Sequence, residues 1–319
     1  MPMSDRASDG RGSWPSWVDG SVRAPGTGCV SVEDVGFQLG CAVFETLLLR
    51  DGRVPFLAEH LERLALGAAG AGIPWPPPWQ PGQALAEFMA VLGDQPDLPG
   101  RLVLRVTLTR GVPGGLPSLV LTAREVAAVP AGGVSAVLAP RAKVAADSLE
   151  GLKSTSRLRN VLAREAAAAA GAWEALMCTE EGDVVEGTIS NLFAVLPAES
   201  GGQCLVTPEL GRGCLGGIVR GRLLAALAGE QAGPGGGVAE LPEILRGLAV
   251  REGRIEPGEL ARASEIMLTN TTGGVIPVRE IQHLWTADSL GLPRAGGVTA
   301  ALASLLESLE GAAEGGLRA

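Results

Sequence analysis

Lys143 and Lys153 are the only lysines of this chain of 319 residues. The other 24 of its 26 lysine and arginine residues are arginines. An arginine guanidinium stays charged and cannot form a Schiff base, whereas a lysine amine can act as a nucleophile or a general base. Lys153, within GLKSTSRLRN at 151–160, is therefore the first candidate for covalent chemistry. The alternative, two surface lysines left by an arginine-biased gene, stays open on composition alone.

Residues for other kinds of catalysis are scarce. The chain has two histidines, His60 and His283, no tyrosine, and five scattered cysteines without a Cys-x-x-Cys pair. This scarcity argues against a His-ligated metal cluster, a Ser-His-Asp triad or a tyrosine acid. We predict no metal site and expect the cysteines to be reduced and mostly buried.

Three further segments have residue types suited to binding a charged small molecule. Period-two alternation would place Glu186, Thr188 and Ser190 on one face of an extended chain, although a lone glutamate at a strand end is usually solvated. A glycine-rich turn at 213–217 opens a helix, a geometry that presents backbone N–H groups to a phosphate. The loop at 269–274 adds the hydroxyl groups of Thr271 and Thr272.

The composition limits the possible partners. With 46% hydrophobic and 19% charged residues, the chain can bury a sizeable core. A formal net charge of −9 disfavours both a broad nucleic-acid footprint and binding to an anionic membrane surface. The sequence has no apolar run long enough to span a bilayer and no signal-peptide pattern at its start. We therefore expect a cytoplasmic enzyme that acts on a small molecule.

The hydrophobic pattern predicts a mixed α/β chain of two domains without internal repeats. The first, 1–139, begins with about fifteen disordered residues and has predicted strands at 17–22, 42–50, 54–56, 102–109, 118–123 and 134–139 and helices at 57–69 and 83–92. A connection at 140–152 contains Lys143, which we take as an ordinary lysine. The second domain, 153–319, has predicted helices at 156–170, 217–228, 256–261 and 296–309, a glycine-rich loop at 233–237, and strands at 173–179, 184–186, 190–196, 265–269 and 275–281.

Taken together, the motifs resemble the class IV aminotransferases, the fold type IV enzymes of pyridoxal 5'-phosphate. The similar segments run in order from about residue 40 to 281: Phe44-Glu45-Thr46-Leu47, His60 to Leu64, Leu152-Lys153-Ser154, Asn160 to Ala163, Glu186-Gly187 through Phe193, Thr207-Pro208, Cys214-Leu215 through Ile218, and Thr271-Thr272 to Pro277-Val278. The resemblance implies a small N-terminal α/β domain and a larger C-terminal pseudo-barrel domain that binds the cofactor.

The resemblance also implies a role for each candidate residue. Lys153 would hold the cofactor as a Schiff base and then transfer protons, and Glu186 would face the pyridine nitrogen. Leu215 would pack against the ring. Arg63 would bind the phosphate, unless it is the solvated end of a helix. The N–H groups of Ile218 and Val219 and the loop of Thr271 and Thr272 would complete the phosphate cup. Many relatives have threonine where this chain has Val219, so one hydroxyl contact is missing.

The reaction is the open question, because the fold hosts both lyases and transaminases. Branched-chain enzymes usually place a tyrosine five residues after the lysine, where this chain has Leu158. D-amino-acid transaminases typically carry an Arg-x-His pair, whereas here Arg110-Gly111 precedes a glycine-rich stretch without histidine. The chain is most similar to the aminodeoxychorismate lyases, which release 4-aminobenzoate and pyruvate for folate synthesis. Arg110 would bind a substrate carboxylate, or else be an exposed loop arginine.

Two further possibilities follow from the family. A class IV aminotransferase acting on branched-chain, D-amino acid or other amine donors is the alternative activity, and a non-catalytic ligand-binding homologue is a minor one. Family members are generally homodimers, so we expect a homodimer here as well.

Overall fold

The structure, a computed structural model, describes residues 13–75, 77–198, 201–229, 240–287 and 297–313. These residues form two compact units, 13–128 with Leu152–Ser156, and Val129–Gly151 with 157–313. The disordered lead-in expected for the first fifteen residues lies mostly outside the described residues, and the glycine-rich loop at 233–237 lies wholly outside them.

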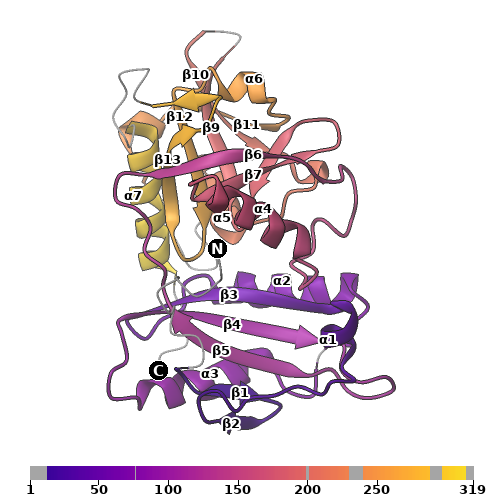
Figure 1. The fold of residues 1–319 in the computed structure, drawn as a ribbon. Helices are drawn as coiled ribbons and strands as arrows, with labels where there is room; N and C mark the ends of the chain where they lie inside the picture. Colours follow the sequence, from indigo (N-terminus) through magenta and orange to yellow (C-terminus); the bar gives the residue numbers. More distant parts are fainter. Residues whose placement is uncertain (1–12, 76, 199–200, 230–239, 288–296, 314–319) are drawn as a thin grey trace. The chain divides into compact units, whose positions relative to one another are not determined.

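The first unit is built on an antiparallel five-stranded sheet with the order β2-β1-β5-β4-β3 (Figure 1). Its elements are β1 (Ser16–Val18), β2 (Ser21–Arg23), α1 (Val35–Leu39), β3 (Ala42–Arg50), α2 (Leu57–Gly70), α3 (Pro81–Gly93), β4 (Arg101–Thr109) and β5 (Leu119–Glu125). Alternate residues of the strands, such as Leu47, Leu104 and Leu121, share one core with Leu64 of α2 and Phe88 of α3. The helices therefore cover one face of the sheet.

The return strand predicted at 54–56 is wrong. After an isolated bridge between Arg50 and Arg53, the chain enters α2 at Leu57. Pro55 has no N–H to give to a strand ladder, and Val54 and Phe56 are buried without forming a strand. The partner of β3 is β4, which pairs with it along its whole length.

The second unit contains a closed sheet. Its strands are β6 (Val134–Lys143), β7 (Glu174–Thr179), β8 (Val184–Gly187), β9 (Asn191–Pro197), β10 (Gln203–Pro208), β11 (Ala249–Gly253), β12 (Glu265–Asn270), β13 (Gly274–Ile281) and β14 (Trp285–Thr286). Because β8 pairs with both β7 and β9, the six strands β9-β12-β13-β6-β7-β8 form a barrel. Strands β10 and β11, which the sequence pattern missed, extend the sheet beyond β9.

Helices flank this barrel. They are α4 (Leu158–Ala169), α5 (Ile218–Leu227), α6 (Pro257–Leu260) and α7 (Gly297–Ala312), with short 3-10 turns at Leu210–Arg212 and Glu243–Leu245. Helix α4 packs on β6 and β7 through small side chains such as Ala163, Ala167 and Ala175. Helix α7, drawn in yellow beside β13 in Figure 1, packs on β12 and β13.

Two segments belong to different units than the sequence suggested. The strand predicted to end the first domain at 139 is β6, which runs to Lys143 inside the barrel because it pairs in parallel with β7 and β13. The segment Leu152–Ser156 belongs to the first unit, since Ser154 forms a bridge with Val43 of β3.

Candidate functional site

A buried carboxylate holds the arginine predicted to bind phosphate. Glu45 of β3 is 1% exposed and accepts hydrogen bonds from Arg63 Nε at 2.7 Å and Nη2 at 2.6 Å. Burial raises the pKa of the Glu45 carboxyl, but the hydrogen bonds and charges of Arg63 and His60 outweigh this and lower it to about 2. The guanidinium is thereby fixed in direction by a permanently charged partner.

His60 completes this cluster from α2. Its Nδ1 lies 2.7 Å from Glu45 Oε2, and burial lowers the pKa of the imidazole against the opposing effect of Glu45. A neutral imidazole that donates Nδ1–H to Glu45 leaves Nε2 as an acceptor. Within the described residues Nε2 is buried and has no hydrogen-bond partner.

Lys153 lies at the edge of the first unit's sheet. Its carbonyl accepts a hydrogen bond from the N–H of Phe44 at 2.9 Å, and Thr155 N–H donates to the carbonyl of Ala42 at 2.9 Å. The Nζ of Lys153 is 4.8 Å from the centroid of the Phe44 ring, within cation–π range. The charge of Lys153 also contributes to the lowered pKa of His60. The amine and the Arg63 cluster therefore lie in the same part of the first unit.

The loop after β4 holds Arg110 through its backbone. Arg110 is exposed, and its N–H donates to the carbonyl of Cys41 at 3.0 Å. Gly111 has a φ of 76°, and a Cβ there would lie 1.9 Å from the carbonyl oxygen of Leu116. Only glycine fits this turn, so the direction in which the chain leaves Arg110 is fixed.

Sequence reasoning missed Arg105. Its Cζ lies 3.6 Å from the centroid of the Phe44 ring that Lys153 also approaches, and its Nε donates to Thr107 Oγ1 at 3.1 Å. Both residues stand on alternate positions of β4, between neighbours that are fully buried. The sequence signal was an arginine and a threonine that alternate with buried apolar residues in the middle of the strand.

In the second unit, Glu186 and Asn191 face each other across β8 and β9 and fix the glycine-rich turn. The N–H of Leu215 donates to Glu186 Oε2 at 2.9 Å, and Asn191 Nδ2 donates to the Leu215 carbonyl at 2.7 Å. A Cβ on Gly217 would lie 1.9 Å from Asn191 Oδ1, so this close approach requires glycine.

Lys143 is not the ordinary lysine that the sequence suggested. Its side chain is 2% exposed, and its Nζ lies 2.7 Å from Glu186 Oε1 and 2.9 Å from Glu150 Oε2. The bulge-containing pairing of β6 with β7 brings Lys143 beside Thr179, one strand from Glu186. Sequence spacing contains no sign of this proximity.

The predicted common face of Glu186, Thr188 and Ser190 is also wrong. Strand β8 ends at Gly187, and the hydroxyls of Thr188 and Ser190 donate to the buried Glu174, at 2.5 Å and 3.2 Å. A Cβ on Gly187 would lie 2.2 Å from Ser190 Oγ, so the chain turns there. Thr188 and Ser190 thus fix the turn that follows Glu186.

The predicted phosphate cup consists of a helix start and a tight turn. Helix α5 begins at Ile218 after Gly217, and no described side chain caps its first turn, where Val219 is buried. Between β12 and β13, Asn270 Oδ1 accepts hydrogen bonds from the N–H groups of Thr272 at 3.1 Å and Gly273 at 2.7 Å. This Asx turn fixes the backbone at Thr271 and Thr272.

These residues fit a cofactor with a phosphate and a ring nitrogen. An uncapped helix start offers N–H donors to an anion. Thr269, paired with Asn191 in the sheet, has a buried hydroxyl without a partner in the described residues. Glu186 Oε1 is buried and ion-paired with Lys143 at 2.7 Å, which leaves a second lone pair for a further hydrogen bond. It could accept one from a protonated ring nitrogen.

The residues predicted to bind the cofactor or the substrate fall into two groups. Lys153, Arg63 and Arg110 are in the first unit. The second unit contains the other predicted cofactor residues: Glu186, Leu215, Ile218, Val219, Thr271 and Thr272.

The cysteines have no catalytic setting. All five are free; Cys178 and Cys214 are buried, Cys41 and Cys204 half-buried and Cys29 exposed. Burial raises the pKa of Cys178 and Cys214 to about 11, which keeps their thiols neutral. Among the described residues, no group of three or more His, Cys, Asp or Glu side chains could hold a metal ion, and no helix is long and apolar enough to cross a membrane.

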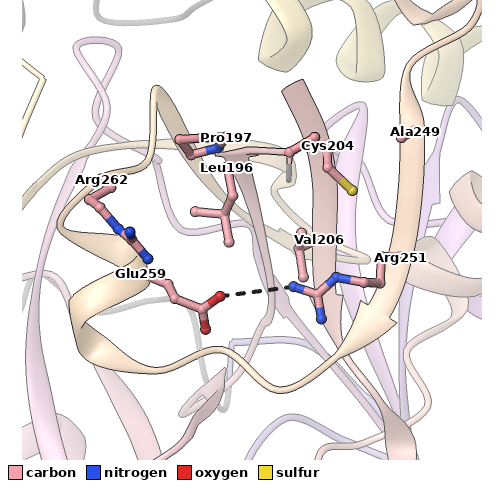
Figure 2. A pocket seen from close by; sticks show the side chains of 9 residues that line it. Leu196, Pro197, Cys204, Val206, Ala249, Arg251, Glu259 and Arg262 are labelled. Carbon is pink, nitrogen blue, oxygen red and sulfur yellow. Dashed lines mark ion pairs between the residues drawn. The ribbon is translucent and has the colours of Figure 1, made fainter. Parts of the chain in front are cut away.

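Figure 2 shows a pocket in the second unit, where Arg251 and Glu259 face each other with 3.9 Å between their charged groups. Its lining comes from β9, β10, β11 and the region of α6: Leu196, Pro197, Ala198, Cys204, Val206, Ala249, Arg251, Glu259 and Arg262. None of the predicted cofactor residues lines it.

Comparison with known proteins shows which family and fold the chain resembles. A family model described as amino-transferase class IV matches residues 42–233. The bifunctional aminodeoxychorismate lyase / D-amino acid transaminase of Mycobacterium tuberculosis is 31% identical over 60% of this chain and 70% of its own length. The aminodeoxychorismate lyase of Bacillus subtilis is 27% identical over 84% of this chain and 87% of its own. The crystal structure of 4-amino-4-deoxychorismate lyase from Pseudomonas aeruginosa matches with a TM-score of 0.70 and 31% identity, over 92% of this chain and 98% of that one.

Proposed function

The chain belongs to the class IV aminotransferases, a family of pyridoxal-phosphate-dependent enzymes, and from that premise we propose that it is an aminodeoxychorismate lyase. The reaction would convert 4-amino-4-deoxychorismate to 4-aminobenzoate and pyruvate, a step of folate synthesis. Two of the relatives and the P. aeruginosa structure described above are named for this activity, which supports the assignment.

We assign the roles as follows. When bound, pyridoxal phosphate would act as the electron sink for the reaction. Lys153 would bind it covalently and move the proton at the substrate carbon. Among the described residues, Lys153 is the only lysine of the first unit. Arg63, held by Glu45, would bind the phosphate. Glu186 would accept a hydrogen bond from the ring nitrogen.

The remaining cofactor contacts come from the backbone of the second unit. The N–H groups of Ile218 and Val219 would donate to the phosphate, and Thr271 and Thr272 would close the cup from the opposite turn. Leu215, which Glu186 and Asn191 hold through its own peptide groups, would pack against the ring.

The residues at the end of β4 favour the lyase over the transaminases. Arg110 stands there on a turn that only Gly111 permits, and the loop that follows contains no histidine to complete an Arg-x-His pair. Leu158, at the position where branched-chain enzymes have tyrosine, is 69% exposed. We therefore propose Arg110 as a ligand for a substrate carboxylate.

A class IV transaminase is the second candidate, because the M. tuberculosis relative is named for both activities. The experiment that decides is turnover of aminodeoxychorismate by the purified protein with no 2-oxo acid present. Release of pyruvate and 4-aminobenzoate supports the lyase. A strict need for a 2-oxo acid, with ping-pong kinetics, establishes the transaminase instead.

The covalent role of Lys153 has its own test. Protein loaded with pyridoxal phosphate should be yellow, and borohydride should fix the cofactor to Lys153. Lys153→Arg keeps the charge but cannot form the bond, so it should lose the visible band and at least about 1000-fold in turnover. A wild-type protein that takes up no cofactor would instead favour a non-catalytic homologue.

We further propose a cytoplasmic homodimer. Helix α4 has an apolar stripe at helical spacing whose side chains are exposed, Leu158, Val161 and Leu162, at 69%, 50% and 56%. A second copy of the chain could cover this stripe.

A further inference from the structure

The second lysine of the chain is buried beside the carboxylate assigned to the ring nitrogen. Lys143 lies between Glu186 and Glu150, with its side chain only 2% exposed. Every other described side-chain cation of the second unit is an arginine. Lys143 thus places a compact ammonium between two carboxylates, where a planar guanidinium would have a different geometry.

The two oxygens of Glu186 are used differently. Oε2 accepts a hydrogen bond from the N–H of Leu215 at 2.9 Å. Oε1 forms an ion pair with Lys143, whose Nζ lies 2.7 Å away. A carboxylate oxygen has two lone pairs. Oε1 can therefore remain paired with Lys143 and still accept a hydrogen bond from a protonated ring nitrogen.

We propose that Lys143 is a positioning residue, which holds Glu186 in place and offsets its negative charge, and so sets how firmly the cofactor's ring nitrogen keeps its proton. The inference rests on the proposed function, because it requires Glu186 to contact that nitrogen.

The surroundings keep the charge of Lys143 constant. Burial lowers the pKa of its ammonium, but the charges of Glu186 and Glu150 outweigh this and raise it. Two further groups interact with Glu186: Arg157, a guanidinium that stays charged although burial lowers its pKa, and Cys214, whose pKa burial raises to about 11. The Cys214 thiol therefore stays neutral between pH 5 and 9, the range in which we expect to measure protonation of the ring nitrogen.

The test uses full-length protein loaded with pyridoxal phosphate that carries ¹⁵N in the ring. The ¹⁵N chemical shift reports protonation of that nitrogen, and its pH midpoint is compared between variants. In Lys143→Met, the charge of Glu186 is no longer offset, so the midpoint should rise by about one pH unit or more. In Lys143→Arg, which keeps the charge, it should return at least halfway to the wild-type value.

Glu150→Gln is the matched control of opposite sign. It removes the other carboxylate beside Lys143 and leaves the contact with Glu186, so the midpoint should fall. If Lys143→Met does not fold, this variant decides: a midpoint that does not fall overturns the inference.

A purely structural role predicts a different result. Lys143→Met would then lower the melting temperature of the cofactor-free protein, while the ¹⁵N midpoint would equal that of the wild type, which overturns the inference and leaves the proposed function standing. A wild-type protein that does not bind the cofactor overturns the proposed function itself.

Discussion

Arg63 donates two hydrogen bonds to Glu45, from Nε at 2.7 Å and from Nη2 at 2.6 Å. The paired geometry fixes the plane of the guanidinium as well as its position. A phosphate would then meet a preorganised cation rather than a mobile side chain, which reduces the entropy lost on binding.

This pair predicts a pH-dependent stability. The pKa of Glu45 falls from 4.5 to about 2 on folding, so its contribution is complete above pH 4.5 and is lost as the pH drops toward 2. The contribution should be about 3 kcal/mol. Urea unfolding of the wild type and Glu45→Gln at pH 7, 5 and 3 measures it. The wild type should lose more than half of its advantage between pH 5 and 3, and parallel losses in both proteins would contradict this account.

The turn after β4 predicts a contrast between two glycines with the same φ of 76°. Gly111→Ala would place a Cβ 1.9 Å from the Leu116 carbonyl oxygen, whereas a Cβ on Gly114 meets nothing within 4 Å. Gly114→Ala should cost about 1 kcal/mol of backbone strain, and Gly111→Ala about 3 kcal/mol or more. The free energy of unfolding in urea is the measurement. Equal losses would show that the loop relaxes and does not fix Arg110.

The exposed stripe of α4 predicts the effect of charge on assembly. The double substitution Val161→Glu and Leu162→Glu would replace two apolar side chains, which are 50% and 56% exposed, by carboxylates. The folded unit should keep its melting temperature, because neither side chain belongs to the core, but the dimer should dissociate. Light scattering after size exclusion gives the mass. A dimer that survives both substitutions would place the interface elsewhere.

Strong local patterns made most elements predictable. The helix at α2 was expected at 57–69 and is Leu57–Gly70, because its apolar residues recur at helical spacing. Strands β10 and β11 were missed for two reasons. Strand β10 has only a short apolar run, Cys204 to Val206, before Thr207 and Pro208, and β11 lies at the sheet edge with Val250 and Arg251 exposed. Neither shows the alternation that marks a half-buried strand.

The environment of the candidate site was less predictable than its members. Lys143 meets Glu186 only through the pairing of β6, β7 and β8, a long-range consequence of the barrel. Thr188 and Ser190 were expected to continue an extended chain, yet the close contacts at Gly187 end the strand. Both errors concern which partner a polar side chain finds, which depends on tertiary packing more than on sequence spacing.

The strand that carries Glu186 is also the strand that closes the barrel. Strand β8 is four residues long and pairs with β7 on one edge and β9 on the other, directly at Glu186 and Asn191. Opening the barrel at β8 would therefore also displace the Glu186 carboxylate. If Glu186 contacts the ring nitrogen as proposed, bound cofactor should slow the exchange of the β8 amide hydrogens with solvent.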